Sequence, residues 1–189
     1  ELSQQHDIHN VTADLAMLRT LSRDLRDAEW DVTAVLDMGD PLLNPCAQPR
    51  LIDLLPGDQT RRCYGVAIDI GTTSNVVYLV DLAQGKVVDR ASAYNAQIQA
   101  GEDVISRIIY AQKRDGLERL QKLVLKTLNG LLDELTTRHE IEPRQIGKAV
   151  VAGNTTMIQL FLAMDPKYLR EMPFIPTVSQ PLPVTAEAI

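Results

Sequence analysis

The sequence contains few aromatic residues: only two phenylalanines and one tryptophan occur among its 189 residues. Leucine, valine, isoleucine and alanine must therefore build the core, and a hydrophobic fraction of 45% is enough for one. Apolar runs of membrane-spanning length are also missing, and no signal peptide opens the chain, which together predict a cytoplasmic protein that does not enter the membrane. Because the first residue is Glu1 rather than methionine, we expect the chain to be an excised fragment of a longer protein.

An excess of basic residues is absent as well. The 19 lysines and arginines against 25 aspartates and glutamates give a formal net charge of −6, which argues against nucleic acid or an anionic membrane as a partner. The two cysteines, Cys46 and Cys63, lack the C-x-x-C spacing of zinc and iron–sulfur sites. Two free reduced thiols are therefore the simplest interpretation.

Several common functional motifs are also missing. The chain has no G-x-x-x-x-G-K-[ST], no G-x-G-x-x-G, no nucleophile elbow and no cluster of metal-binding residues. A nucleotide site in this chain must therefore be built from a pattern other than the Walker or Rossmann fingerprint.

Residues 1–61 are predicted to form a small α+β domain. A leucine repeat at helical spacing predicts a helix over 15–28. Short apolar runs predict strands over 8–13, 32–36 and 51–55, giving the order strand, helix, strand, strand. So few residues cannot bury a large core by themselves.

Residues 62–189 are predicted to form a larger α/β domain with a mixed sheet. Three strands come first, two amphipathic helices follow, and a further strand and helix complete the pattern. The predicted strands are 63–70, 74–81, 87–94 and 146–152, and the predicted helices are 103–112, 117–137 and 157–164. The last strand is apolar almost throughout, which predicts a central position in the sheet.

The turn after the first strand of this domain is the strongest functional signal. An apolar run reaches Asp69, and Gly71, Thr72, Thr73 and Ser74 follow before the next apolar run begins. Backbone N–H groups, hydroxyl donors and a glycine that permits close approach are what a nucleotide phosphate requires. Asp69 lies where a carboxylate could face hydrated magnesium. An ordinary hairpin explains the turn alone equally well, although a structural two-residue turn needs no such row of hydroxyls.

A second turn repeats this chemistry. The apolar strand 146–152 ends in Gly153, and Asn154, Thr155 and Thr156 lead directly into a helix. Asn or Thr is a suitable N-cap, and the carboxyl end of a strand in an α/β sheet is where ligands commonly bind. The alternative is a plain capped helix after a strand, which is common.

A third segment, 95–107, joins the third strand to the first helix. Glu102 and Asp103 favour a helix start there. Arg107 is polar on an otherwise apolar helix. Three explanations fit this pattern: the arginine pairs with an acid, reaches a phosphate, or is simply solvated.

These residues resemble a known superfamily. The pattern D-x-G-T-T in the first hairpin, followed by strand, helices, strand and helix, resembles the N-terminal half of the actin, sugar-kinase and heat-shock-chaperone ATPases, which have a ribonuclease-H-like fold. The segments DIGTTSNVVYLVDL, NAQIQAGEDVISRI and VAGNTTMIQLFLAMDP together resemble the ATP-dependent reductive activators of corrinoid proteins. The resemblance covers residues 62–176, and residues 1–61 are similar to the middle or linker domain of those proteins. It implies that 62–189 is the truncated N-terminal part of an actin-like ATPase domain.

The resemblance also implies cofactors and partners. The full-length protein would bind ATP and magnesium and would carry an iron–sulfur cluster outside this fragment. Electrons would pass from the cluster to a cobalt(II) corrinoid protein, and ATP hydrolysis would help to drive the step to cobalt(I). A homodimer is one of the assemblies that the resemblance allows.

Residue roles follow from the resemblance only at matched positions. Asp69 would position magnesium or the attacking water. Two groups would contact the nucleotide: Gly71, Thr72, Thr73 and Ser74 would line the phosphates, and Gly153, Asn154, Thr155 and Thr156 would lie across the cleft. The resemblance gives the block 101–107 no firm role.

The sequence departs from the family at Ala96, where the family often has proline. The second phosphate loop and the adenosine pocket belong to a C-terminal half that the fragment lacks, so the fragment alone should bind ATP poorly. Two other functions fit the same fold: a small-molecule kinase, for which no general base is evident, and a non-catalytic nucleotide-binding interaction domain.

Overall fold

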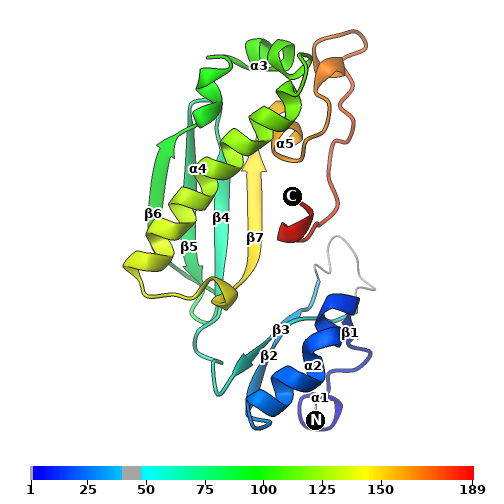
Figure 1. Cartoon of the computed structure of the whole chain (residues 1–189), viewed down its shortest axis with the longest axis vertical. Coiled ribbons are helices and arrows are strands. Elements are labelled where there is room, and N and C mark those ends of the chain that lie inside the picture. The colour runs from blue at the N-terminus through cyan, green and yellow to red at the C-terminus, as the bar shows by residue number, and fades with distance from the viewer. Residues whose placement is uncertain (1, 40–47) are drawn as a thin grey trace. The chain divides into compact units, whose positions relative to one another are not determined.

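The computed structural model describes residues 2–39 and 48–189. Cys46 lies outside these ranges, and Cys63 is a free thiol as predicted. Two compact units are distinguished: unit 1 comprises Glu1–Gly65, Asp81–Lys86 and Glu142–Lys148, and unit 2 comprises Val66–Val80, Val87–Ile141 and Ala149–Ile189. Figure 1 shows the elements of both.

A three-stranded sheet and two helices form most of unit 1. The elements in chain order are α1 (Leu2–Gln5), β1 (Thr12–Ala13), α2 (Leu15–Asp27), β2 (Val32–Asp37) and β3 (Arg50–Pro56). The strand order is β1-β3-β2, with β1 parallel and β2 antiparallel to β3. The predicted order of strand, helix, strand and strand is confirmed. The first strand, predicted over 8–13, is shorter than predicted because Asn10 has a positive φ angle, which extended backbone excludes.

A four-stranded sheet carries the rest of the fold. Its strands are β4 (Tyr64–Ile70), β5 (Ser74–Asp81), β6 (Lys86–Tyr94) and β7 (Ile146–Gly153), in the spatial order β6-β5-β4-β7. In Figure 1, β5 runs opposite to β6 and β7, so the sheet is mixed as predicted.

The remaining described elements of the chain are helices. They are α3 (Val104–Ala111), α4 (Gly116–Arg138) and α5 (Thr155–Phe161), with short 3-10 helices η1 (Ala96–Gln99), η2 (Pro143–Gln145), η3 (Lys167–Leu169) and η4 (Ala186–Ala188). Figure 1 shows α4 lying across the sheet. Its predicted apolar stripe is buried: Leu120, Val124, Leu128, Leu131 and Leu135. Alternate residues of β4 and β5 are buried as well, which the period of two requires: Val66, Ile68, Ile70, Val77 and Leu79.

Two expectations need correction. The strand β7 was predicted to be central in the sheet, but it lies at an edge of the four described strands, and the side chain of Val150 is 63% exposed. An apolar sequence shows that a strand can be covered on both faces, but it does not show which strands flank it. The helix α5 begins at Thr155 rather than 157 and ends at Phe161 rather than 164, because Ala163 adopts a positive φ that terminates it.

Among the helices of the described residues, none is long and apolar enough to cross a membrane.

The C-terminal end of α4 is fastened to β6 by a small charged cluster. Arg138 Nη1 donates to Asp89 Oδ2 at 2.6 Å, and His139 Nε2 lies 2.8 Å from the same oxygen. Arg138 also pairs with Glu134 one turn earlier on α4. Hydrogen bonds from His139 first and Arg138 second hold the pKa of Asp89 well below its ordinary range.

We expect Asp89→Asn to lower the melting temperature at pH 7, because the ionised carboxylate accepts both of these hydrogen bonds. A depressed folded-state pKa contributes stability above the unfolded value of about 3.9, and that contribution is lost as the pH falls below it. The difference in melting temperature between the wild type and Asp89→Asn should therefore shrink between pH 5 and pH 2. Asp133→Asn, on the exposed side of α4, is the matched control. A difference for Asp89→Asn that is constant over this pH range would contradict the assignment.

Candidate functional site

The predicted phosphate turn is the tight hairpin between β4 and β5. The N–H of Gly71 donates to the carbonyl oxygen of Ser74 at 3.0 Å and closes the turn. A Cβ atom on Gly71 would lie only 2.4 Å from that same oxygen, a distance that real Cβ atoms do not adopt. Glycine is therefore required here for close approach within the hairpin.

Buried donors hold successive carbonyl groups of the hairpin from behind. The side-chain amide of Asn95 donates to the Gly71 carbonyl at 2.8 Å, and the guanidinium of Arg107 donates through Nη2 to the Thr72 carbonyl at 2.6 Å. The backbone N–H of Asn95 donates to the Thr73 carbonyl at 2.8 Å. The side chains of Asn95 and Arg107 are completely buried. The turn is thus built on a fixed polar support rather than held only by its own hydrogen bond.

This support determines where the N–H groups of the turn point. In a trans peptide group the C=O and the N–H point in opposite directions. Because the Gly71 and Thr72 carbonyls point toward buried donors, the N–H groups of Thr72 and Thr73 point away from them. Neither N–H donates to any residue that the structure describes. Successive N–H groups beside the exposed side chains of Thr73 and Ser74 are therefore available to bind an anion.

The second predicted turn meets the first. Asn154 is the N-cap of α5: its Oδ1 accepts from the N–H of Met157 at 3.0 Å, as predicted for a capped helix. Its Nδ2 donates to the hydroxyl oxygen of Thr72 at 3.2 Å. A Cβ on Gly153 would lie 2.9 Å from the Ile70 carbonyl oxygen, so this residue also permits close approach. Two segments far apart in the sequence therefore form one site within unit 2.

The remaining predicted residues differ in exposure. Gly153, Asn154 and Thr155 are exposed, whereas Thr156 is only 6% exposed and faces the interior of the unit.

Asp69 is exposed near the end of β4, on the opposite sheet face from its buried neighbours Ile68 and Ile70. Across residues 2–39 and 48–189, no group of three or more His, Cys, Asp or Glu side chains could hold a metal ion. A magnesium ion at Asp69 would take its other ligands from water and phosphate oxygens, which is how this ion usually binds.

Sequence reasoning missed the support behind the hairpin. Of the three explanations for Arg107, the solvated one is wrong, because the side chain is 0% exposed. Pairing with an acid is also wrong, since no carboxylate in the described part of the chain lies within ion-pair distance. A usable signal was present: Arg107 lies on the same helical stripe as Ile108 and Ala111, both buried. Asn95 carried no comparable signal.

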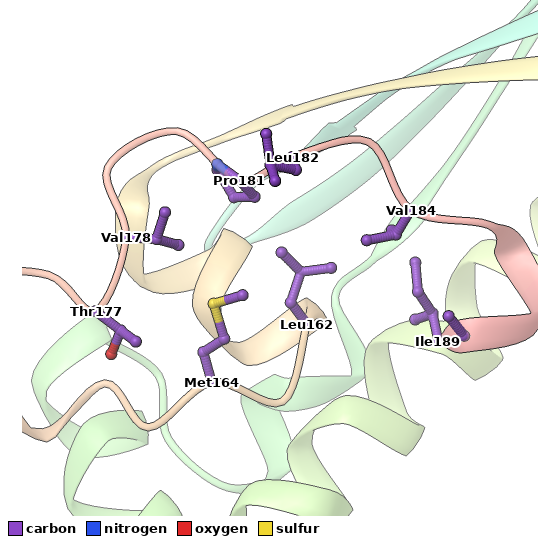
Figure 2. A pocket seen from close by; sticks show the side chains of 9 residues that line it. Leu162, Met164, Thr177, Val178, Pro181, Leu182, Val184 and Ile189 are labelled. Atoms are coloured by element: carbon purple, nitrogen blue, oxygen red, sulfur yellow. The ribbon is translucent and has the colours of Figure 1, made fainter.

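A separate apolar pocket lies between the end of α5 and the C-terminal segment (Figure 2). Leu162 and Met164 line one side, and Val178, Leu182 and Val184 line the other. This pocket contains none of the predicted phosphate-site residues, and its lining offers no charged group. We therefore do not assign it to the candidate site.

Two regions of one known protein family match this chain along nearly its full length. The RACo middle region matches residues 64–189, and the RACo linker region matches residues 1–61. The chain belongs to this family. It is similar to a corrinoid activation enzyme, RamQ of Eubacterium limosum, with 38% identity over 128 residues, which are 67% of this chain and 22% of that protein.

A solved structure shows the same fold. The chain superimposes on a reductive activator for corrinoid, iron–sulfur protein with a TM-score of 0.78 and 41% identity. The match covers 93% of this chain and 27% of that one. The chain thus spans about a quarter of the length of the relatives it matches.

We expect glycine-to-alanine substitutions at Gly71 and Gly130 to have opposite effects on stability. Gly71→Ala should lower the free energy of unfolding by about 1–3 kcal/mol, because the new methyl group overlaps the Ser74 carbonyl. Gly130→Ala should raise it by about 0.5–1 kcal/mol, because Gly130 lies within α4 and no atom lies within 4 Å of the added Cβ. Urea denaturation followed by circular dichroism measures both. A Gly71→Ala variant as stable as the wild type would show that the hairpin is not packed as described.

Proposed function

We propose that the full-length protein uses ATP to drive reduction of a corrinoid protein from cobalt(II) to cobalt(I), and that this chain supplies the first phosphate-binding lobe of its ATPase domain. The hairpin carries this proposal, because it directs the Thr72 and Thr73 N–H groups and two exposed hydroxyls outward from a fixed support. Membership of the RACo family and the names of the two relatives support the corrinoid as substrate.

The residues divide the work of binding ATP. Gly71, Thr72, Thr73 and Ser74 would line the phosphates, with the two N–H groups acting as donors to phosphate oxygens. Across from them, the proposed contacts are Gly153, Asn154, Thr155 and, to the small extent that it is exposed, Thr156. Asp69 would bind hydrated magnesium or orient the attacking water. We propose that the domain has the actin-like, ribonuclease-H-like fold and that a second lobe completes the site.

The redox step needs a donor outside this chain. We propose that this donor is an iron–sulfur cluster elsewhere in the full-length protein, as the resemblance to the reductive activators of corrinoid proteins implies. The cluster would lose one electron, cobalt(II) would gain it and become cobalt(I), and hydrolysis of ATP to ADP and phosphate would supply the driving free energy. In this scheme the chain contributes phosphate binding rather than electron transfer.

The test is ATP-dependent formation of cobalt(I) by the full-length protein, followed by visible absorbance in the presence of a cobalt(II) corrinoid protein and a reductant. We expect Asp69→Ala to lower the rate of ATP-dependent cobalt(I) formation by about 100-fold or more. Circular dichroism should show that the fold of this variant is intact. Asp133→Ala removes an exposed carboxylate of α4 and should leave the rate unchanged.

Full activity of Asp69→Ala would remove Asp69 from the site. ATP hydrolysis by the wild type without any change in cobalt would instead favour the small-molecule kinase, and a screen of metabolite acceptors would follow. A wild type that binds ATP without hydrolysing it would favour the non-catalytic interaction domain.

A further inference from the structure

Arg107 is a completely buried arginine that bonds only to neutral groups. Its Nε donates to the Gly101 carbonyl at 2.9 Å, and its Nη2 donates to the Thr72 carbonyl at 2.6 Å. Its Nη1 faces Gln97 Oε1 at 3.4 Å and the sulfur of Met157 at 3.3 Å. The guanidinium therefore links α3, the loop before it, α5 and the phosphate hairpin through uncharged partners.

No carboxylate among the described residues forms an ion pair with this cation, although the Asp103 carboxylate is close enough to favour the charged form of Arg107 and so to oppose the lowering of its pKa by burial. The nearest acid along α3 is Asp103, whose carboxylate accepts both the N–H and the hydroxyl of Ser106 and so caps the helix. Burial lowers the pKa of Arg107, yet arginine remains protonated in proteins. A buried charge that no carboxylate contacts is costly, because burial removes the water that would otherwise solvate it.

We propose that Arg107 is the positioning residue of the phosphate hairpin, and that an anionic polyphosphate bound on the outer side of the hairpin adds negative charge near a guanidinium that has no ion-pair partner of its own. By binding the Thr72 carbonyl, Arg107 fixes the Thr72–Thr73 peptide group with its N–H outward. The positive charge acts through this peptide group, since the side chain itself is shielded from solvent. This inference rests on the proposed nucleotide site.

A purely structural role makes a different prediction. If Arg107 contributed only to packing and to the stability of the domain, its replacement would weaken the binding of every ligand equally, because it would destabilise the folded domain. A positioning role instead weakens ligands in proportion to the phosphate charge that faces the hairpin. Comparing ATP, inorganic triphosphate and adenosine separates the two, because adenosine presents no phosphate.

The experiment uses the full-length protein and isothermal titration calorimetry with these three probes. Arg107→Met keeps the length of the side chain and removes the charge and the donors, whereas Arg107→Lys keeps the charge without the planar fork. Gln159→Met is the matched control: Gln159 is also buried, at 1% exposure, on α5, and its side-chain amide has no hydrogen-bond partner among the described residues. Circular dichroism establishes that each variant folds.

We expect Arg107→Met to raise the dissociation constants of ATP and triphosphate about tenfold or more, with adenosine changed by less than about twofold. Arg107→Lys should fall between Arg107→Met and the wild type for ATP and triphosphate. Gln159→Met should bind all three probes like the wild type. Should Arg107→Met fail to fold, Arg107→Lys decides the question by the same comparison of triphosphate with adenosine.

An unchanged triphosphate affinity in a folded Arg107 variant would overturn the inference, and so would an equal loss of adenosine and ATP affinity. A wild type that binds neither ATP nor triphosphate would overturn it together with the nucleotide site. If phosphate selectivity depends on Arg107 but no cobalt(I) forms, the positioning role stands and the proposed corrinoid reduction fails.

Discussion

The bond from the buried guanidinium of Arg107 to the Thr72 carbonyl is the interaction on which the site depends. At 2.6 Å it joins α3 to a hairpin thirty-five positions earlier in the chain. The approach of α3 depends in turn on Gly101, because a Cβ there would lie 2.7 Å from Ser106 and 3.0 Å from the Arg107 nitrogen. Asp103 is the N-cap of α3, and its carboxylate accepts the N–H of Ser106. The start of the helix at this position places Arg107 on its buried side. Residues 101–107 thus support the hairpin turn at residues 71–74.

The interior of unit 2 is apolar in most places and polar behind the hairpin. Apolar side chains of β4, β5 and α4 fill most of it, whereas the part behind the hairpin contains the buried polar residues Asn95, Gln97 and Arg107. Buried polar groups reduce stability unless each finds a partner, and the amides of Asn75 and Gln159 find none among the described residues. An apolar core of the same volume would offer no donors to the hairpin carbonyls. The buried polar residues behind the hairpin therefore fix the orientation of its backbone.

The sequence predicted what local patterns determine. Glycine and hydroxyl residues between apolar runs indicated the hairpin, and Asn154 before a helix indicated the cap that is observed. Position within the sheet and the partner of Arg107 depend on segments distant in sequence, which no local pattern encodes. For that reason β7 was placed centrally although it lies at an edge, and the arginine was left between three explanations. The role of each residue toward ATP likewise depends on a ligand and remains a prediction.

Asn154 serves two structures with one side chain. Its oxygen holds the first turn of α5 through Met157, and its nitrogen holds the hydroxyl oxygen of Thr72. A ligand that binds the Thr72 hydroxyl would therefore change a contact of Asn154, the residue that caps α5. The N-cap of α5 and the phosphate hairpin therefore share one side chain, so that substitution of Asn154 would remove both contacts at once.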